Sequence, residues 1–185
     1  GASEGTTVAG GNGNGSAANQ FSNNNGVAVD ALFNVYVADV SNNRIQKWAP
    51  GATTGTTVAG GNGMGSAANQ LSYPNGVAVD ASGNIYVVDG SNNRIQKWPP
   101  GASEGTTVAG GNSMGSAANQ LSSPNDVALD ASGNLYVADQ NNDRIQKVTN
   151  GPQIIIAAGE TIGTLTVKGI DDPSYEVEET ITLTP

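Results

Sequence analysis

The side chains best suited to chemistry in this sequence are charged pairs that recur every fifty residues. An aspartate and, five residues later, an arginine frame each of three short loops, as Asp39 with Arg44, Asp89 with Arg94 and Asp139 with Arg144. A carboxylate and a guanidinium at this spacing can form a charge-assisted hydrogen bond. Because the pair occurs once in every repeat, the pattern favours a structural role over a catalytic one. We expect each pair to pin a hairpin or to link neighbouring repeats.

The residue types that are missing exclude several classes of enzyme. The chain of 185 residues contains no His and no Cys, so it lacks the groups that serve Ser-His-Asp or Cys-His catalysis and most zinc sites. Sixteen acidic residues against seven basic ones give a net charge of −9, the wrong sign for neutralising nucleic-acid phosphates. No apolar run reaches the roughly 18 residues of a membrane span. We therefore expect a non-enzymatic protein with no nucleic-acid partner and no membrane span.

Two further sets of side chains could carry or bind carbohydrate. Asn14 begins the one Asn-x-Ser/Thr sequon of the sequence and is a glycosylation candidate if the protein is exported. Aromatic residues at repeated positions could stack on a sugar ring, namely Tyr36, Tyr86, Tyr136, Trp48 and Trp98. Their places within predicted strands favour packing between repeats over sugar binding.

These side chains sit in an array of three identical-length repeats. Residues 1–50, 51–100 and 101–150 are copies of one unit, with no insertion or deletion between them. In the second copy, the strand signals cover residues 56–59, 77–80, 85–89 and 94–98. Connections of four residues join the last three of these strands and make them antiparallel neighbours.

The apolar pattern shows how these small sheets pack. Residues 77–79 and 85–88 are apolar at consecutive positions, which predicts that both faces of the sheet are covered. Glycine accounts for 26 residues and charged residues for only 12%, about half the usual share, as expected for short strands and polar turns. Four short strands in each 50-residue unit, stacked face to face, predict the blades of an all-β propeller.

The repeated motif is similar to the NHL repeat. It reads NGVAVDASGNIYVVDGSNNRIQKW at residues 75–98 and recurs from Asn25 and Asn125. The resemblance implies three four-stranded blades of a propeller that usually closes with six. Three strands of each blade would come from this motif, and the fourth, at 56–59 in the second copy, would lie at the outer edge. The first copy departs from the pattern, with Leu32-Phe33 where the others have Ser-Gly, which predicts a weaker and bulkier turn.

Residues 151–185 lie outside the repeat. Strand signals cover residues 154–157, 163–170 and 179–184, and the elements AGET at 158–161 and IDD at 170–172 are similar to a Calx-beta domain. The resemblance implies part of an immunoglobulin-like β-sandwich. Members of that family can bind calcium through carboxylates that match Asp171, Asp172, Glu176, Glu178 and Glu179. Calcium needs 6–8 oxygen ligands, and a solvated acidic loop is the other reading.

Both halves of the chain are incomplete as folding units, which is the main indication of function. Closed propellers have 4–8 blades, so three blades leave apolar sheet faces open. We expect self-association or additional blades to cover them, in an extracellular or cell-surface structural or adhesive protein that forms a fibre or surface array. One alternative is a ligand-binding or carbohydrate-binding propeller with a calcium site. A second is a propeller lactonase or lyase, which the absence of His disfavours.

Overall fold

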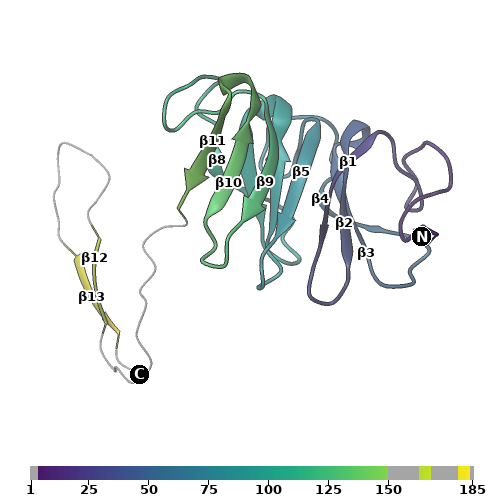
Figure 1. The fold of residues 1–185 in the computed structure, drawn as a ribbon, viewed down its shortest axis with the longest axis horizontal. Helices are drawn as coiled ribbons and strands as arrows, with labels where there is room; N and C mark the ends of the chain where they lie inside the picture. The colour runs from purple at the N-terminus through teal and green to yellow at the C-terminus, as the bar shows by residue number, and fades with distance from the viewer. Residues whose placement is uncertain (1–3, 150–162, 168–178, 184–185) are drawn as a thin grey trace. The chain divides into compact units, whose positions relative to one another are not determined.

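The computed structural model describes residues 4–149, 163–167 and 179–183. The chain separates into two compact units, Gly1–Val148 and Thr149–Pro185. The first unit carries the repeats, and it is built from strands joined by turns and short 3₁₀ segments (Figure 1). In the described part of the chain, no helix has the length and apolar character needed to cross a membrane.

The first unit consists of three antiparallel sheets, which we call blades 1, 2 and 3. Blade 1 has the strand order β1 (Asn24–Val29), β2 (Val35–Asp39), β3 (Arg44–Trp48) and β4 (Thr56–Gly60). Blade 2 repeats this order with β5 (Pro74–Val79), β6 (Ile85–Asp89), β7 (Arg94–Trp98) and β8 (Thr106–Gly110). Blade 3 contains β9 (Pro124–Leu129), β10 (Leu135–Asp139) and β11 (Arg144–Val148). The all-β propeller-blade architecture predicted from the repeat is therefore confirmed.

The fourth strand belongs to a different blade from the one expected. The strand at 56–60 pairs with β3 of the preceding repeat, not with the strands at 74–98. Only seven residues separate Trp48 from Thr56, whereas thirteen separate Gly60 from Pro74, and the shorter connection closes as a hairpin. Blades 1 and 2 therefore each combine strands from two consecutive repeats, so their bounds do not coincide with the predicted units 1–50, 51–100 and 101–150. As a result, blade 3 has three strands among the described residues instead of the expected four.

A short 3₁₀ turn joins the second and third strands of each blade. These turns are η1 (Val40–Asn42), η2 (Gly90–Asn92) and η3 (Gln140–Asn142). Each ends on a left-handed residue, Asn43, Asn93 or Asp143, with φ of 50–51°. Asn and Asp tolerate this conformation because their short side chains hydrogen-bond locally. The Asp and the Arg of each repeated pair are thereby brought directly opposite each other in the strand register.

The apolar core lies between the blades. Tyr36, Ala38 and Ile45 of blade 1 pack against Val77, Ile85 and other side chains of blade 2. Tyr86, Val88 and Ile95 on the opposite side of blade 2 pack in the same way against Val127, Leu135 and Val137 of blade 3. Each blade thus has an N-side face toward the preceding blade and a C-side face toward the next one.

The first hairpin of blade 1 holds a phenylalanine in a backbone conformation that favours glycine. Phe33 has φ of 62°, where the equivalent Gly83 and Gly133 have φ of 79°. Its side chain is 75% exposed, so the burial that offsets this cost is small. We expect Phe33→Gly to stabilise the protein by about 0.5–1 kcal/mol in urea unfolding, because relief of the left-handed strain exceeds the added chain entropy.

Phe33→Ala is the matched control for that prediction. It removes the same exposed ring but keeps a β-carbon in the left-handed region, so it should bring no gain in unfolding free energy. If the alanine and glycine variants proved equally stable, the backbone strain at Phe33 would not be the cause of the gain in unfolding free energy.

The second unit is described only over one strand pair. β12 (Gly163–Val167) and β13 (Glu179–Leu183) are antiparallel, with Gly163 opposite Leu183. They fall within two of the three strands expected there, and the expected strand at 154–157 lies outside the described residues. The Calx-beta resemblance stays a prediction.

Candidate functional site

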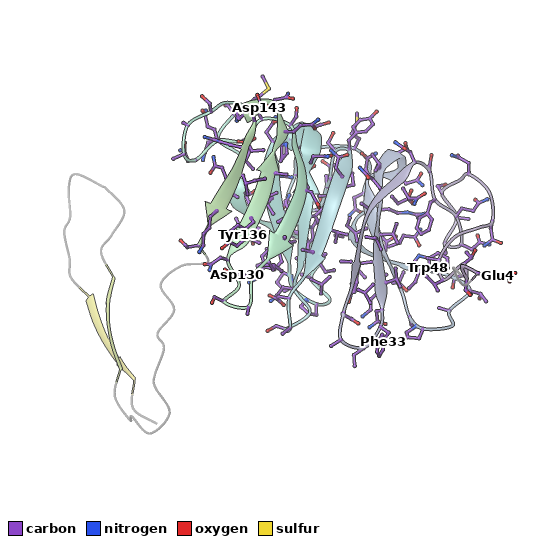
Figure 2. The ribbon with its side chains drawn as sticks, in the orientation of Figure 1. Glu4, Phe33, Trp48, Asp130, Tyr136 and Asp143 are labelled. Atoms are coloured by element: carbon purple, nitrogen blue, oxygen red, sulfur yellow. The ribbon has the colours of Figure 1, made fainter. Side chains whose placement is uncertain are left out.

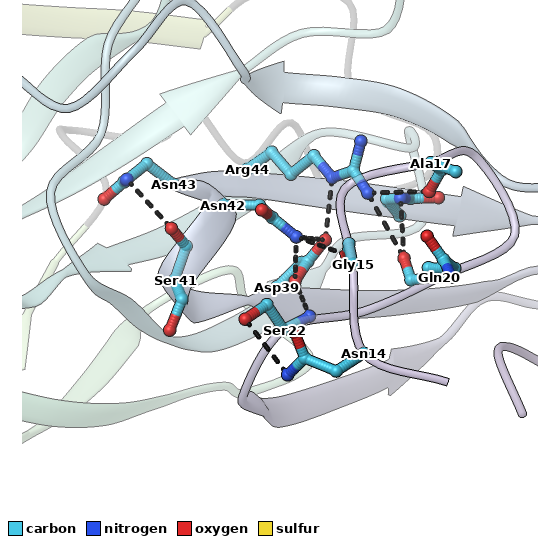
Figure 3. Close-up of polar contacts among 11 residues, drawn as sticks. Asn14, Gly15, Ala17, Gln20, Ser22, Asp39, Ser41, Asn42, Asn43 and Arg44 are labelled. Carbon is cyan, nitrogen blue, oxygen red and sulfur yellow. Dashed lines mark hydrogen bonds and ion pairs between the residues drawn. The ribbon is translucent and has the colours of Figure 1, made fainter. Parts of the chain in front are cut away.

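The repeated Asp–Arg pairs are brought together as buried ion pairs. Arg Nε lies 2.7 Å from Asp Oδ2 in each blade, and all three carboxylates are fully buried. In blade 1, Asp39 also accepts hydrogen bonds from the backbone N–H of Ser22 at 2.7 Å and from Asn42 Nδ2 at 2.9 Å (Figure 3). The carboxylate therefore ties the hairpin between β2 and β3 to the loop that precedes β1.

The arginine completes this clamp. Arg44 donates from its terminal nitrogen to the carbonyl oxygens of Ala17 at 3.0 Å and Gln20 at 3.2 Å, as Figure 3 shows. Arg94 and Arg144 bond the equivalent carbonyls of the later loops. The polar atoms of each pair thus form hydrogen bonds with the loop backbone and with the pair's own hairpin. The geometry corresponds to the expected pinning of the hairpin; the bonds run within a blade and its preceding loop.

The surroundings of the carboxylates differ between blades. Burial raises the pKa of Asp89 in the middle blade, against the opposing effects of the hydrogen bonds from Asn92, Ser72 and Arg94. Burial also acts upward on Asp139 in blade 3, but there the equivalent bonds outweigh it and the pKa is lowered. Blade 2, which is covered on both sides, therefore desolvates its carboxylate more strongly than blade 3 does.

A second set of aspartates holds the turn between the first two strands of each blade. Asp80 accepts hydrogen bonds from Asn84 and Ser82, and from the Tyr86 hydroxyl at 3.2 Å. Asp130 makes the equivalent bonds, and that from the Asn134 side chain contributes most to lowering its pKa. Lys97 lies 5.5 Å above the Tyr86 ring. These charged groups are engaged in local structure.

The aromatic residues considered for sugar stacking lie mostly between blades. Trp48 and Trp98 are 2% exposed, and Tyr86 is fully buried. Phe21, from the loop before blade 1, packs on Trp48 with ring centroids 5.7 Å apart. This burial agrees with packing as their role.

The remaining predicted site residues are not gathered into a described site. Asn14 is exposed and its side chain donates to Ser22 Oγ at 3.3 Å. Of the five carboxylates expected to bind calcium, Glu179 begins β13, and the other four lie outside the described residues: Asp171, Asp172, Glu176 and Glu178. Within the described ranges, no group of three or more acidic residues is arranged to hold a metal ion.

The candidate functional surfaces are the two outer faces of the blade stack. On the N-side face of blade 1, Val27 is 63% exposed, whereas the equivalent Val77 is 4% exposed against blade 1. On the C-side face of blade 3, Ile145 is 67% exposed, whereas Ile95 is fully buried against blade 3. Figure 2 places Trp48 in the first blade and Tyr136 in the third, at the two ends of the stack. The expectation of open faces did not identify these side chains.

A cleft of about 520 Å3 lies between blades 1 and 2 beside the turns at Asp30 and Asp80. Its lining includes Leu32, Lys47 and Ile85. Because both carboxylates already accept several hydrogen bonds, the cleft offers mainly apolar surface and the Lys47 ammonium.

Comparison with known proteins identifies the blade type. The NHL repeat model matches residues 71–98 and 121–148, which contain β5–β7 and β9–β11. The described strands β5–β7 and β9–β11 are therefore similar to NHL repeats, in agreement with the motif. No curated protein sequence matches the chain significantly.

Solved propeller structures superpose on this chain. An auxiliary nutrient binding protein from Bacteroides thetaiotaomicron VPI-5482 does so with a TM-score of 0.54 at 18% identity, over 65% of this chain and 36% of that one. A streptogramin B lyase gives 0.51 at 17% identity, over 70% and 38%. A protein of unknown function from the same Bacteroides strain gives 0.50 at 24% identity, over 62% and 32%. The likeness shows the fold, and this chain spans about a third of the length of each of these proteins.

Proposed function

We propose that this chain is a non-enzymatic, extracellular structural or adhesive repeat protein whose blade stack is extended by further blades or by self-assembly. The observation that carries the proposal is the contrast between end and interior positions: Ile145 is 67% exposed where Ile95 is buried. Burying one such side chain contributes about 1.5–3 kcal/mol. Since Val27 and Val29 are likewise exposed at the other end, covering both faces supplies a substantial driving force for assembly.

The chemistry of the side chains supports the non-enzymatic part of the proposal. The sequence contains no His or Cys, and its repeated Asp and Arg side chains hold loops and turns. The streptogramin B lyase shares the fold at 17% identity, and a shared propeller fold does not carry an activity with it. A lactonase or lyase activity is therefore the least favoured reading.

Extracellular location is supported by one observation. Asn14, in the one sequon, is exposed in the structure, as a glycosylated residue must be.

A second candidate function is a ligand-binding propeller, and the cleft beside Lys47 favours it. This cleft has a volume in the range of small-molecule sites, and its lining combines the apolar side chains of Leu32 and Ile85 with charged groups of both signs, Lys47, Asp30 and Asp80. The calcium site proposed for the acidic segment 171–179 belongs to the same reading. A melting temperature that rises with calcium, or saturable binding of a carbohydrate that is weakened in Lys47→Ala, would support it.

Assembly is tested by sedimentation velocity over a range of protein concentrations, with electron microscopy of the concentrated sample. We expect species larger than the 18.5 kDa chain, increasing with concentration. Ionic strength should be physiological, because each chain carries a net charge of −9 and salt screens the repulsion. A monomer at every concentration would contradict the proposal.

A further inference from the structure

We propose that the partner of the open faces is a second copy of this chain, and that two copies close a six-bladed ring. This inference rests on the proposed function and specifies its partner. In each of the two joints of such a ring, the C-side face of blade 3 in one copy would pack on the N-side face of blade 1 in the other.

The first argument is that the two open faces carry the residues of a joint that already exists inside the chain. The interior joint presses Ala28, Tyr36, Ala38 and Ile45 of blade 1 against blade 2. The open face of blade 3 has the same residue types at the equivalent positions, in the order Ala128, Tyr136, Ala138 and Ile145. These four side chains of the interior joint are thus reproduced without a substitution, whereas Val58 and Ala59 of β4, which also pack in that joint, have no counterpart in the described strands of blade 3.

The other half of the joint is reproduced almost as closely. The N-side face of blade 2 consists of Val77, Val79, Ile85, Val87 and Trp98. The N-side face of blade 1 has Val27, Val29, Val35, Val37 and Trp48 at the equivalent positions, a change of one methylene group. Val37 and Trp48 are already buried within the single chain, so a joint between copies would newly bury chiefly the exposed Val27 and Val29.

The number of blades selects the stoichiometry. A joint between unlike faces continues from copy to copy until the rotation closes a ring. Closed propellers contain 4–8 blades. A ring built from copies of this three-bladed stack alone has six blades, the one multiple of three within that range, so two such stacks close it.

One position makes the joint between copies looser than the interior one. A β-carbon added at Gly26 would lie 2.6 Å from the Asn75 carbonyl oxygen and 2.7 Å from Gly76 Cα of the next blade. Blade 3 has Asp126 at this position, which would meet Asn25 and Gly26 of the second copy. Some separation of the backbones must accommodate it, so Asp126→Gly is expected to tighten the dimer by about tenfold.

The test measures the mass of the full-length chain and of two face variants by sedimentation velocity. The wild type should reach twice 18.5 kDa and no more. Ile145→Asp and Val27→Asp each place a charge in both joints of the ring and should raise the dissociation constant by more than about a hundredfold. Both side chains are exposed in the single chain, so unfolding of the variants should be unchanged. Met64→Asp, at a residue that is also exposed and that lies in a loop, is the control.

Mixing the two face variants distinguishes this arrangement from others. In a mixed dimer, one joint carries both aspartates and the other joint is wild type, so an equimolar mixture should form dimers that neither variant forms alone. Loss of the dimer in Ile145→Asp but not in Val27→Asp would mean like faces pair, and long polymers would mean the ring stays open. Either result overturns the two-copy ring and leaves the proposed assembly function standing, whereas a monomer overturns both.

Discussion

Replacing Asp89 by alanine is expected to destabilise the protein by about 3–5 kcal/mol, because it leaves the Arg94 guanidinium buried without its carboxylate. Arg94 Nε lies 2.7 Å from Asp89, and its side chain is only 11% exposed. The same substitution removes the acceptor for the Ser72 N–H at 2.7 Å and for Asn92 Nδ2 at 2.8 Å. The measurement is the free energy of unfolding from urea titration.

Blade 3 supplies the matched control. Asp139 makes the equivalent bonds, but its partner Arg144 is 30% exposed. Without its carboxylate, Arg144 can be solvated by water at a lower free-energy cost than Arg94. Asp139→Ala should therefore destabilise the protein by clearly less than Asp89→Ala. A loss below about 1 kcal/mol for Asp89→Ala would show that the buried pair contributes no more than a surface ion pair.

The second large effect is expected at Trp98, the largest side chain in the joint between blades 1 and 2. It is 2% exposed and packs with Ile45, Val77 and Ile85. Truncation to alanine removes this contact and leaves a cavity, so Trp98→Ala should lower the free energy of unfolding by about 3–5 kcal/mol. Thermal and urea unfolding both measure this loss.

Trp98→Phe separates the packing of the ring from its polar group. The Nε1–H of Trp98 is buried and has no hydrogen-bond partner among the described residues, and an unsatisfied donor costs free energy. Removing it offsets part of the smaller ring's loss, so the phenylalanine variant should be destabilised by less than half as much as the alanine variant. Equal losses in both variants would indicate that Nε1–H has a partner, such as water.

The sequence allowed the blades to be predicted, but not which strand completes each blade. Strand and turn signals around Val77, Ile85 and Arg94 are local, and their repetition at fifty-residue intervals identified a stack of meanders. The strand at 56–60 was placed in the wrong blade because its own residues do not encode its partner. Its pairing with β3 follows from the shorter of its two connections along the chain, and this became evident only from the folded sheet.

The candidate site was predictable to a similar extent. The Asp39–Arg44 spacing predicted an ion pair, whereas the clamp onto Ala17 and Gln20 depends on a loop 24–27 residues earlier in the chain. Phe33 was identified as a departure from its repeat, but its left-handed backbone became evident only in the structure.

By itself, the sequence determined the repeat, the strands within it, and the absence of the side chains that most enzymes require. Only the tertiary structure decided which of three identical residues is exposed. Ile45 and Ile95 are fully buried, and Ile145 is 67% exposed, although all three occupy the same position in an Arg-Ile-Gln-Lys strand. The physical reason is that burial is set by the neighbouring blade, which lies outside the repeat, so the function proposed for this chain resides at the two positions in the stack where that neighbour is missing.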